Sequence, residues 1–175
     1  MARALIMVDY QNEWSDRKSD YYIGRLNPAI AVAKRVLAAA REKGFVVIYT
    51  QHIEPEPTVA FKRGTKGAAI IDGLSPVKTD KVVVKNRISP FYRTGLDSFI
   101  AKRRIREIAV CGIMTNLCVR STVSDAYDRD ISVTVISDAC ASDSARTDRF
   151  TFDDIRRTRP EVRIITSREF IRSLG

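Results

Sequence analysis

The sequence predicts an α/β fold in which helices cover both faces of a parallel sheet. Short apolar runs alternate with segments of helical period from one end of the 175-residue chain to the other. Most of these runs are continuous β-branched or aliphatic stretches without in/out alternation, as in strands that are buried on both faces. Alternating units of this length favour parallel strands with helical crossovers. Because no repeat, linker or compositional break divides the units, we expect one domain over residues 1–175.

Six apolar runs are expected to form the strands. Asp9 closes the first run after five apolar residues, and Lys85 follows the third. In order along the chain, the expected strands are Ala4–Val8, Phe45–Thr50, Lys81–Val84, Ile108–Gly112, Ile131–Ser137 and Val162–Thr166. Their β-branched content is typical of interior strands in a sheet that is covered on both sides.

Helical segments fill most of the gaps between these runs. The first is expected to start with Asn27 as N-cap and Pro28 at the first helical position, and to stop at Gly44. Between these ends, apolar side chains recur at helical spacing. The other helices are expected to begin near Thr94, to begin near Thr115 or Asn116, to lie within Ala145–Arg157, and to follow a cap at Ser167.

The segment Gln51–Asp80 departs from this alternation. It shows little periodicity and contains Pro55, Pro57, Gly64, Gly67, Gly73 and Pro76. Loops of this length in compact domains are usually functional or covering segments. We therefore expect it to shape the specificity of a binding site.

The net charge of +9 raises the question of a nucleic-acid or membrane partner, and the charge pattern argues against both. Basic residues are spread along the chain and interleaved with acids, whereas nucleic-acid binders gather them into a stripe with stacking aromatics. No apolar stretch approaches the roughly 20 residues that cross a bilayer. The run Ala4–Val8 is too short for a signal peptide, so we expect a cytoplasmic protein without nucleic-acid or membrane partners.

Three cysteines, Cys111, Cys118 and Cys140, cannot all pair with one another, and their spacing is no disulfide framework. With His52 as the single histidine, they also make a poor zinc set, because zinc sites use close pairs of Cys or His. Free thiols in a reducing compartment fit best, and we expect no metal and no cofactor. Cys111 and Cys140 lie within or beside strands and are expected to be structural.

Three chemically reactive residues follow predicted strands at their carboxyl ends. Asp9 follows the first strand, Lys85 the third, and Cys118 lies after the fourth at the start of a helix. In open α/β sheets, ligands bind outside the carboxyl ends of the strands, where the winding direction reverses. Three reactive residues at the same edge of the sheet therefore indicate a functional site more strongly than any one of them alone.

Each of the three also has a structural interpretation. Cys118 is either a thiol whose pKa is lowered by a helix N-terminus or a small buried hydrophobe. Asp9 is either a functional carboxylate or a cap for the following segment. Lys85 is either functional or the first solvated residue after a buried strand. Together they make chemical sense, because a carboxylate can take the proton of a cysteine while a lysine stabilises the thiolate.

Four blocks of the sequence resemble isochorismatase-like cysteine hydrolases, over roughly four fifths of the chain. The blocks are Ala4–Gln11, Arg63–Ile71, Val82–Phe91 and Val110–Ala141. The last is the most specific, with Cys118-Val119, then Thr122, then Asp125-Ala126, then Asp138-Ala139-Cys140-Ala141 in order.

The resemblance implies a three-layer fold with six parallel strands in the order 3-2-1-4-5-6. It implies a catalytic triad of Asp9, Lys85 and Cys118, with Asp9 as proton acceptor. It also implies a non-proline cis peptide between Ile113 and Met114, which would aim the backbone amides of Met114 and Cys118 at a developing oxyanion. Family members are usually dimers or tetramers, so a homo-oligomer is expected.

The branch of the family follows from what the sequence has and lacks. Nicotinamidases in the family use an aspartate and several histidines as metal ligands, which a single histidine cannot supply. Some isochorismatases that cleave vinyl ethers lack the cysteine, which is present here. The expected activity is therefore cleavage of a small amide or N-carbamoyl substrate with release of ammonia, of N-carbamoylsarcosine amidase type.

Two other functions remain open, and the substrate contacts are open as well. The chain could be a nicotinamidase-like amidase without the metal, or a non-catalytic binding member, although such a member would be expected to lose one of the three residues. A dinucleotide-binding module is weaker, because residues 110–115 lack the three-glycine fingerprint. The candidate substrate-binding residues are Gln11, Trp14, His52, Arg87, Phe91, Thr115 and Arg146, with Arg120 as a further cation for a substrate carboxylate.

Overall fold

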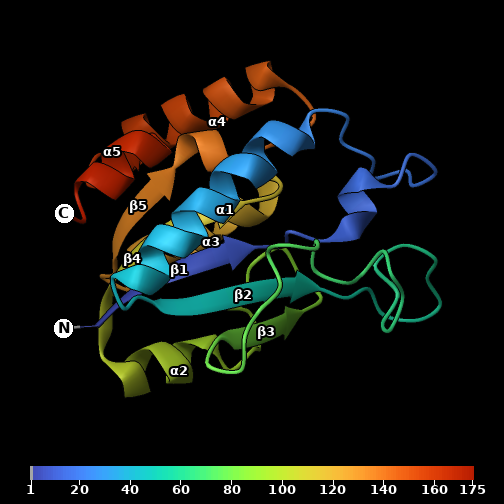
Figure 1. Cartoon of the computed structure of the whole chain (residues 1–175), viewed down its shortest axis with the longest axis horizontal. Helices are drawn as coiled ribbons and strands as arrows, with labels where there is room; N and C mark the ends of the chain where they lie inside the picture. Colours follow the sequence, from blue (N-terminus) through green and yellow to red (C-terminus); the bar gives the residue numbers. More distant parts are fainter. Residues whose placement is uncertain (1) are drawn as a thin grey trace.

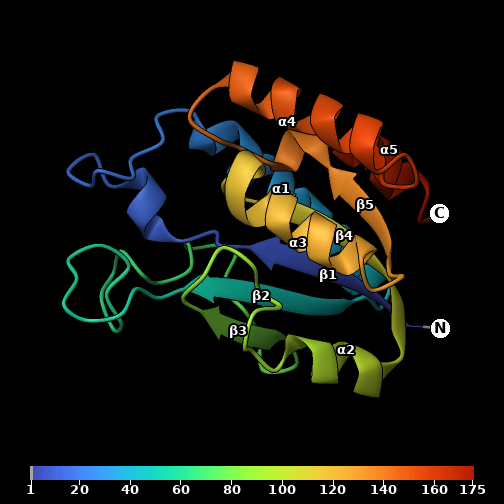
Figure 2. The same cartoon turned by 180° about the vertical axis from the view of Figure 1, so that it is seen from behind.

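The computed structural model describes residues 2–175 and contains a six-stranded parallel sheet in the order β3-β2-β1-β4-β5-β6, as expected (Figures 1 and 2). Every predicted run overlaps a strand. The strands are β1 (Ala2–Val8), β2 (Val46–His52), β3 (Lys81–Lys85), β4 (Ile105–Gly112), β5 (Ser132–Ile136) and β6 (Arg163–Ile165). The central strand β1 is buried from Ala4 to Val8, which explains its unbroken apolar run.

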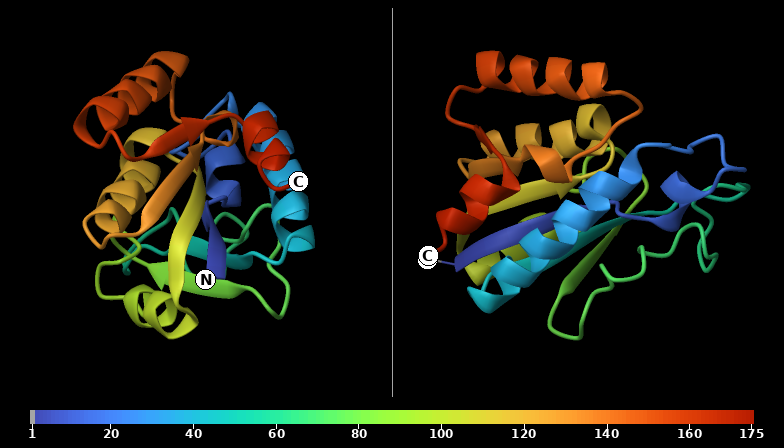
Figure 3. Two further views of the ribbon diagram at one scale, coloured as in Figure 1. Left: turned by 90° about the vertical axis from the view of Figure 1, so that its left-hand side faces the viewer. Right: turned by 45° about the horizontal axis from the view of Figure 1, so that its top comes forward.

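Helices cover both faces of the sheet. They are α1 (Leu26–Glu42), α2 (Leu96–Arg103), α3 (Arg120–Tyr127), α4 (Ala145–Thr158) and α5 (Ser167–Arg172). Helices α1 and α5 pack together on one face, and α2, α3 and α4 lie on the other (Figure 3). This division follows from right-handed crossovers that wind in opposite directions from the middle of the sheet. Within residues 2–175, none of the helices combines the length and apolar character needed to cross a bilayer.

Two predicted helix caps are wrong by one or two residues. The N-cap of α1 is Arg25 rather than Asn27, because the buried face of the helix already starts at Leu26. Pro28 still lies in the first turn, where its missing N–H removes no helical hydrogen bond. The N-cap of α5 is Thr166, not Ser167, and its hydroxyl accepts from the backbone N–H of Glu169 in a capping box.

The winding direction reverses between β1 and β4, and this reversal brings the predicted site together. Val8 pairs in register with Gly112 of β4 on one side and with Thr50 of β2 on the other. At the next pairing along the edge, His52 lies opposite Lys85 of β3. The carboxyl ends of four adjacent strands therefore meet, as the topological rule for open α/β sheets requires.

Two loops extend beyond this edge and pack on each other. The segment after β1 and the long loop after β2 lie side by side past the strand tips (Figure 1). Their backbones join at an antiparallel bridge between Gln11 and Ile70, and the N–H of Glu13 donates to the carbonyl of Gly67 at 2.8 Å. The loop predicted to shape specificity is thus anchored to the segment that follows Asp9.

The close approach of β1 and β4 requires glycine at position 112. A Cβ built on Gly112 would lie 2.2 Å from the carbonyl oxygen of Val8, and its φ is +153°. We expect Gly112→Ala to lower the free energy of unfolding by about 3 kcal/mol or more, measured by urea denaturation. Gly24→Ala, whose new Cβ would meet only ordinary contacts from 3.5 Å, should change it by about 0.5 kcal/mol or less. Equal effects from the two substitutions would contradict this account.

Candidate active site

Asp9 follows β1 in a left-handed backbone conformation, with φ of +48°. Thr50 of the neighbouring strand donates its hydroxyl to Oδ1 at 2.5 Å, and Trp14 Nε1 donates to the Asp9 carbonyl at 2.7 Å. The second carboxylate oxygen, Oδ2, lies 2.7 Å from Lys85 Nζ. Oδ2 has no further hydrogen-bond partner within residues 2–175. One oxygen is therefore held in place while the other faces the cation.

Lys85 ends β3, and its side chain is fully buried, like that of Asp9. Besides the carboxylate, Nζ lies 3.1 Å from the Arg87 carbonyl oxygen, 3.3 Å from Cys118 Sγ and 3.4 Å from His52 Nδ1. Burial lowers the pKa of Lys85, but Asp9 and then Cys118 more than offset this, so the pKa is raised above its ordinary value. The group is therefore a buried ammonium that links the carboxylate to the sulfur.

Cys118 lies in a wide helical turn, Thr115–Val119, that leads directly into α3. In this turn the N–H of Val119 donates to the carbonyl of Met114, five residues back. The chain enters the turn through the cis peptide between Ile113 and Met114, and Ile113 is tied to β1 because its N–H donates to the Val8 carbonyl at 3.0 Å. Cys118 is buried, and its Sγ accepts from Lys85. The structure thus brings Asp9, Lys85 and Cys118 into one cluster.

The surroundings of Cys118 favour its neutral thiol over the thiolate. Burial, followed by the charge of Asp9, raises its pKa to about 12, although Lys85 acts in the opposite direction. The expectation that this pKa is lowered is wrong in direction, because burial removes the sulfur from water and Asp9 places a like charge beside it. A thiolate can then form only when the proton is accepted close by, and Asp9 Oδ2 is the neighbouring base.

Two polar groups at this turn, one in the backbone and one in a side chain, have no protein partner. The N–H of Met114 donates to no acceptor within residues 2–175, as a group that meets an oxyanion should. Oδ1 of Asn116 is buried and likewise has no partner among those residues. Buried polar atoms in folded proteins are almost always paired with protein or water, so this acceptor two residues before Cys118 is open to a water molecule or a ligand.

The turn is anchored from behind by Asp148 of α4. Its Oδ1 accepts from the hydroxyls of Thr115 and Ser142, both at 2.6 Å, and its Oδ2 is paired with Arg25. Thr115 also donates its N–H to the Ala141 carbonyl at 3.0 Å. The side chain of Thr115, a candidate for substrate binding, is therefore engaged in fixing the turn.

The candidate residues Gln11, Trp14 and His52 lie beside the cluster, and each has a specific contact there. The Gln11 amide clamps the end of β2, accepting from the His52 N–H and donating to the His52 carbonyl, both at 2.8 Å. Trp14 packs against Phe61 with ring centroids 4.9 Å apart, in addition to its bond with Asp9. His52 contacts Lys85 through Nδ1 and Glu54 through Nε2, at 2.7 Å.

The side chains of the other candidates form no hydrogen bond or ion pair with Asp9, Lys85 or Cys118 within residues 2–175. Phe91 is buried beneath the guanidinium of Arg129, 4.5 Å from its ring centroid. Arg120 forms an ion pair with Asp154. The exposed residues Arg87 and Arg146 form no ion pair within residues 2–175, and so keep free charges.

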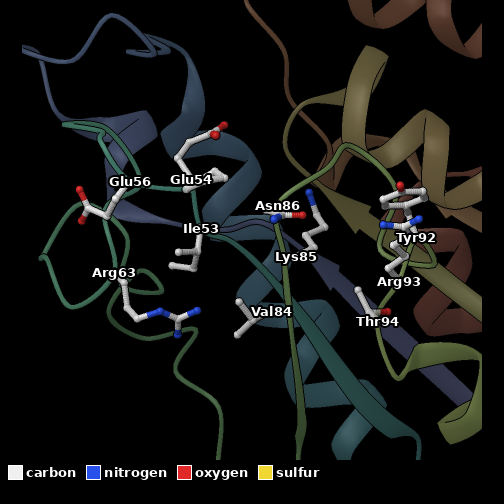
Figure 4. A pocket seen from close by; sticks show the side chains of 11 residues that line it. Ile53, Glu54, Glu56, Arg63, Val84, Lys85, Asn86, Tyr92, Arg93 and Thr94 are labelled. Atoms are coloured by element: carbon white, nitrogen blue, oxygen red, sulfur yellow. The ribbon is translucent and has the colours of Figure 1, made fainter.

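A cleft of about 430 Å³ opens beside the cluster, within the size range of small-ligand sites. It is lined by residues 53–56, Arg63, 84–86 and 92–94, and Lys85 is the cluster member that belongs to its wall. Figure 4 shows Arg63 on one side of it and Tyr92 with Arg93 on the other. Ile53 and Val84 give it an apolar floor.

The residues present do not suit the metal site that nicotinamidases of the resembling family carry. No three His, Cys, Asp or Glu side chains converge as potential ligands in the described part of the chain. His52 instead has both ring nitrogens engaged by neighbouring side chains. Cys111 and Cys140 are buried free thiols, and burial raises the pKa of Cys111 to about 12.

Sequence analysis missed four residues that complete the cluster: Thr50, Glu54, Asn116 and Asp148. Thr50 was detectable as the last residue of a predicted strand, and Asp148 as an acid on the apolar side of a predicted helix, in line with Ile155. For Glu54 and Asn116 the sequence carries no signal, because their roles depend on which atoms lie opposite them.

Comparisons with known proteins agree with this fold. The sequence profile of the isochorismatase domain matches residues 3–169. The ureidoacrylate amidohydrolase RutB of Methylorubrum extorquens is 30% identical over 79% of this chain and 69% of its own length. A cysteine hydrolase from Pseudomonas syringae superimposes with a TM-score of 0.88 over 98% of this chain and 92% of that one, at 25% identity. An N-carbamoylsarcosine amidase from Thermoplasma acidophilum gives a TM-score of 0.82 over 95% and 97%, at 24% identity, which shows a shared fold.

The opposing charges around Cys118 predict opposite effects on its alkylation. Because Asp9 raises the pKa of the thiol and Lys85 lowers it, Asp9→Asn should speed the reaction with iodoacetamide at pH 8, and Lys85→Met should slow it. A substitution that moves the pKa of the thiol by one should change the alkylation rate roughly tenfold. Peptide mass spectrometry measures the rate at Cys118 alone, in variants shown to be folded by circular dichroism. Slower alkylation in Asp9→Asn would contradict this description of the charges.

Proposed function

Because the chain belongs to the isochorismatase family, we propose that it is a cysteine-dependent amidohydrolase. The proposed reaction cleaves a C–N bond of a small carbamoyl or carboxamide substrate and releases ammonia, without a metal. The observation that carries the proposal is the continuous contact from Asp9 Oδ2 through Lys85 Nζ to Cys118 Sγ in a buried cluster. Its similarity to a ureidoacrylate amidohydrolase supports the substrate class.

The first step is attack of the Cys118 sulfur on the substrate carbonyl carbon. Asp9 accepts the thiol proton as the C–S bond forms, and the carbonyl π electrons move onto oxygen. Lys85 stabilises the negative charge on sulfur as it develops. The N–H groups of Met114 and Cys118 would then donate to the oxyanion, whose negative charge they stabilise.

The second step expels ammonia and leaves an acyl or carbamoyl thioester on Cys118. Asp9 returns its proton to the departing nitrogen, and the oxyanion electrons re-form the carbonyl as the C–N bond breaks. A water molecule then gives a proton to Asp9 and attacks the thioester carbonyl. Collapse of this second oxyanion breaks the C–S bond, and the proton on Asp9 returns to the sulfur.

The structure also suggests how the candidate residues divide between substrate and support. Gln11 and Thr115 use their polar side-chain atoms within the protein, and we assign them to positioning. Trp14 and Phe91 are assigned to packing near the site. Arg87 and Arg146 are the candidate partners for a substrate carboxylate, and their free charges support this.

Ammonia release from a panel of N-carbamoyl amino acids, nicotinamide and simple amides tests the proposal. Cys118→Ala should lower release by roughly a thousandfold or more, and a chelator should leave the wild-type rate unchanged. The best substrate then distinguishes a carbamoylase from a nicotinamidase-like amidase. Release that survives in Cys118→Ala would overturn the cysteine mechanism, and loss of release on chelation would overturn its metal independence.

The unpaired oxygen of Asn116 predicts a substrate contact. We propose that Oδ1 accepts an N–H of the substrate amide or carbamoyl group, because such groups carry donors and the buried acceptor has none. Asn116→Ala should raise KM by about tenfold, with a smaller change in kcat, in steady-state assays of ammonia release. Ser124→Ala on the exposed side of α3 is the control, expected to leave KM unchanged. A wild-type KM in Asn116→Ala would contradict the contact.

A further inference from the structure

The buried ammonium of Lys85 has one more acceptor than it has hydrogens. An ammonium carries three N–H groups, and four acceptors lie within 3.4 Å of Nζ. Asp9 neutralises its charge, and the Arg87 carbonyl oxygen accepts one of its N–H groups and so fixes the direction of that bond. His52 Nδ1 and Cys118 Sγ lie at similar distances, 3.4 and 3.3 Å. The mechanism described above gives the imidazole no role.

The contacts of the imidazole determine which of its nitrogens carries the proton. Nδ1 faces an ammonium, which can only donate, so this nitrogen must present a lone pair. Nε2 lies 2.7 Å from Glu54 Oε1, an acceptor, so this nitrogen must carry the hydrogen. A carboxylate that fixes the tautomer of a histidine in this way also fixes the orientation of its ring.

We propose that His52 and Glu54 form a positioning pair for Lys85. Glu54 holds the imidazole in the tautomer with hydrogen on Nε2, and Nδ1 then accepts from the ammonium and keeps it between Asp9 and Cys118. The inference deepens the proposed function, on which its kinetic consequence rests. The pair touches Lys85 and not the reacting atoms, so it acts through the cation.

The surroundings of His52 hold the ring in place for this task. The backbone of His52 is clamped by the Gln11 amide at both its N–H and its carbonyl. The ring of Phe61 packs edge-on against the imidazole, with centroids 5.4 Å apart and an angle of 84°. Phe61 is itself packed against Trp14, whose indole is bonded to Asp9. The support of the imidazole therefore runs back to the backbone carbonyl of Asp9.

The outer end of the pair faces the cleft. Glu54 lies on its wall, and its side chain is 38% exposed, whereas that of His52 is 15% exposed (Figure 4). Glu56 lies on the same wall but pairs with Lys62 instead. These two glutamates thus offer a matched comparison, since both are acids of one loop and only Glu54 contacts the imidazole.

Nuclear magnetic resonance tests the tautomer without any substrate. His52 is the single histidine of the chain, so labelling with ¹⁵N-histidine gives one ring to observe. We expect wild type to show hydrogen on Nε2 and a lone pair on Nδ1 at neutral pH. Lys85→Met should shift the Nδ1 signal, Glu54→Leu should shift the Nε2 signal because its hydrogen loses its acceptor, and Glu56→Leu should leave both signals unchanged. Hydrogen on Nδ1 in the wild type would overturn the proposal, whether or not a substrate is found.

Kinetics tests the consequence for the site. His52→Asn keeps an acceptor near the position of Nδ1, and His52→Leu does not. We expect His52→Leu to lower kcat by about tenfold or more with KM nearly unchanged, the effect of losing one charge-assisted hydrogen bond, while His52→Asn recovers most of the loss. Glu54→Leu should resemble His52→Leu.

The outcomes separate this inference from the proposed function. Equal kcat in His52→Leu and His52→Asn, or a wild-type kcat in Glu54→Leu, would overturn the positioning pair while leaving the amidohydrolase intact. If no substrate of the panel is hydrolysed, the rate of Cys118 alkylation replaces kcat. That rate should change in His52→Leu and return toward the wild-type value in His52→Asn; no change in His52→Leu would overturn the pair.

Discussion

The buried ion pair between Asp9 and Lys85 is the constraint on which the rest of the site depends. An isolated charge buried without a partner costs several kcal/mol, so neither residue could occupy its position alone. Their strands, β1 and β3, are not neighbours, and β2 separates them. The pair therefore requires the carboxyl ends of β1, β2 and β3 to stay in register, and Thr50 of β2 supplies a hydroxyl to the carboxylate across that gap. The contacts that keep these strand ends in register therefore also fix the geometry of the site.

The same burial favours the neutral form of the Cys118 thiol. A thiolate beside Asp9 in a dry site would face a like charge, and the raised pKa of Cys118 reflects both burial and that charge. Lys85 offsets part of this repulsion, but it already belongs to the carboxylate. In the proposed mechanism, the proton of the thiol leaves as the substrate carbonyl takes up the negative charge, which avoids a free thiolate beside Asp9.

Local patterns in the sequence located the strands, whereas their order was implied by the resemblance to the family and agrees with the structure. The rule that ligands bind at the carboxyl ends of strands singled out Asp9, Lys85 and Cys118, which the structure brings together. Asp9 and Lys85 were found as polar residues that end apolar runs, which burial on both faces makes conspicuous. The role of Gln11 and the partner of His52 were not predictable, since they depend on strand register: His52 lies opposite Lys85 only because β2 and β3 pair as they do. The pKa of Cys118 was predicted in the wrong direction for a related reason, because burial is a property of the whole fold and the helix end is a local one.

The contacts of His52 bear on whether its ring could serve as a metal ligand. An imidazole has one lone pair in its neutral form, on the nitrogen that carries no hydrogen. Here that lone pair faces the ammonium of Lys85, and the other nitrogen faces Glu54. To bind a metal, the ring would have to give up one of these contacts and bring a cation next to another cation. The single lone pair of the neutral ring therefore accepts from Lys85 in this site. The same lone pair cannot bind a metal at the same time.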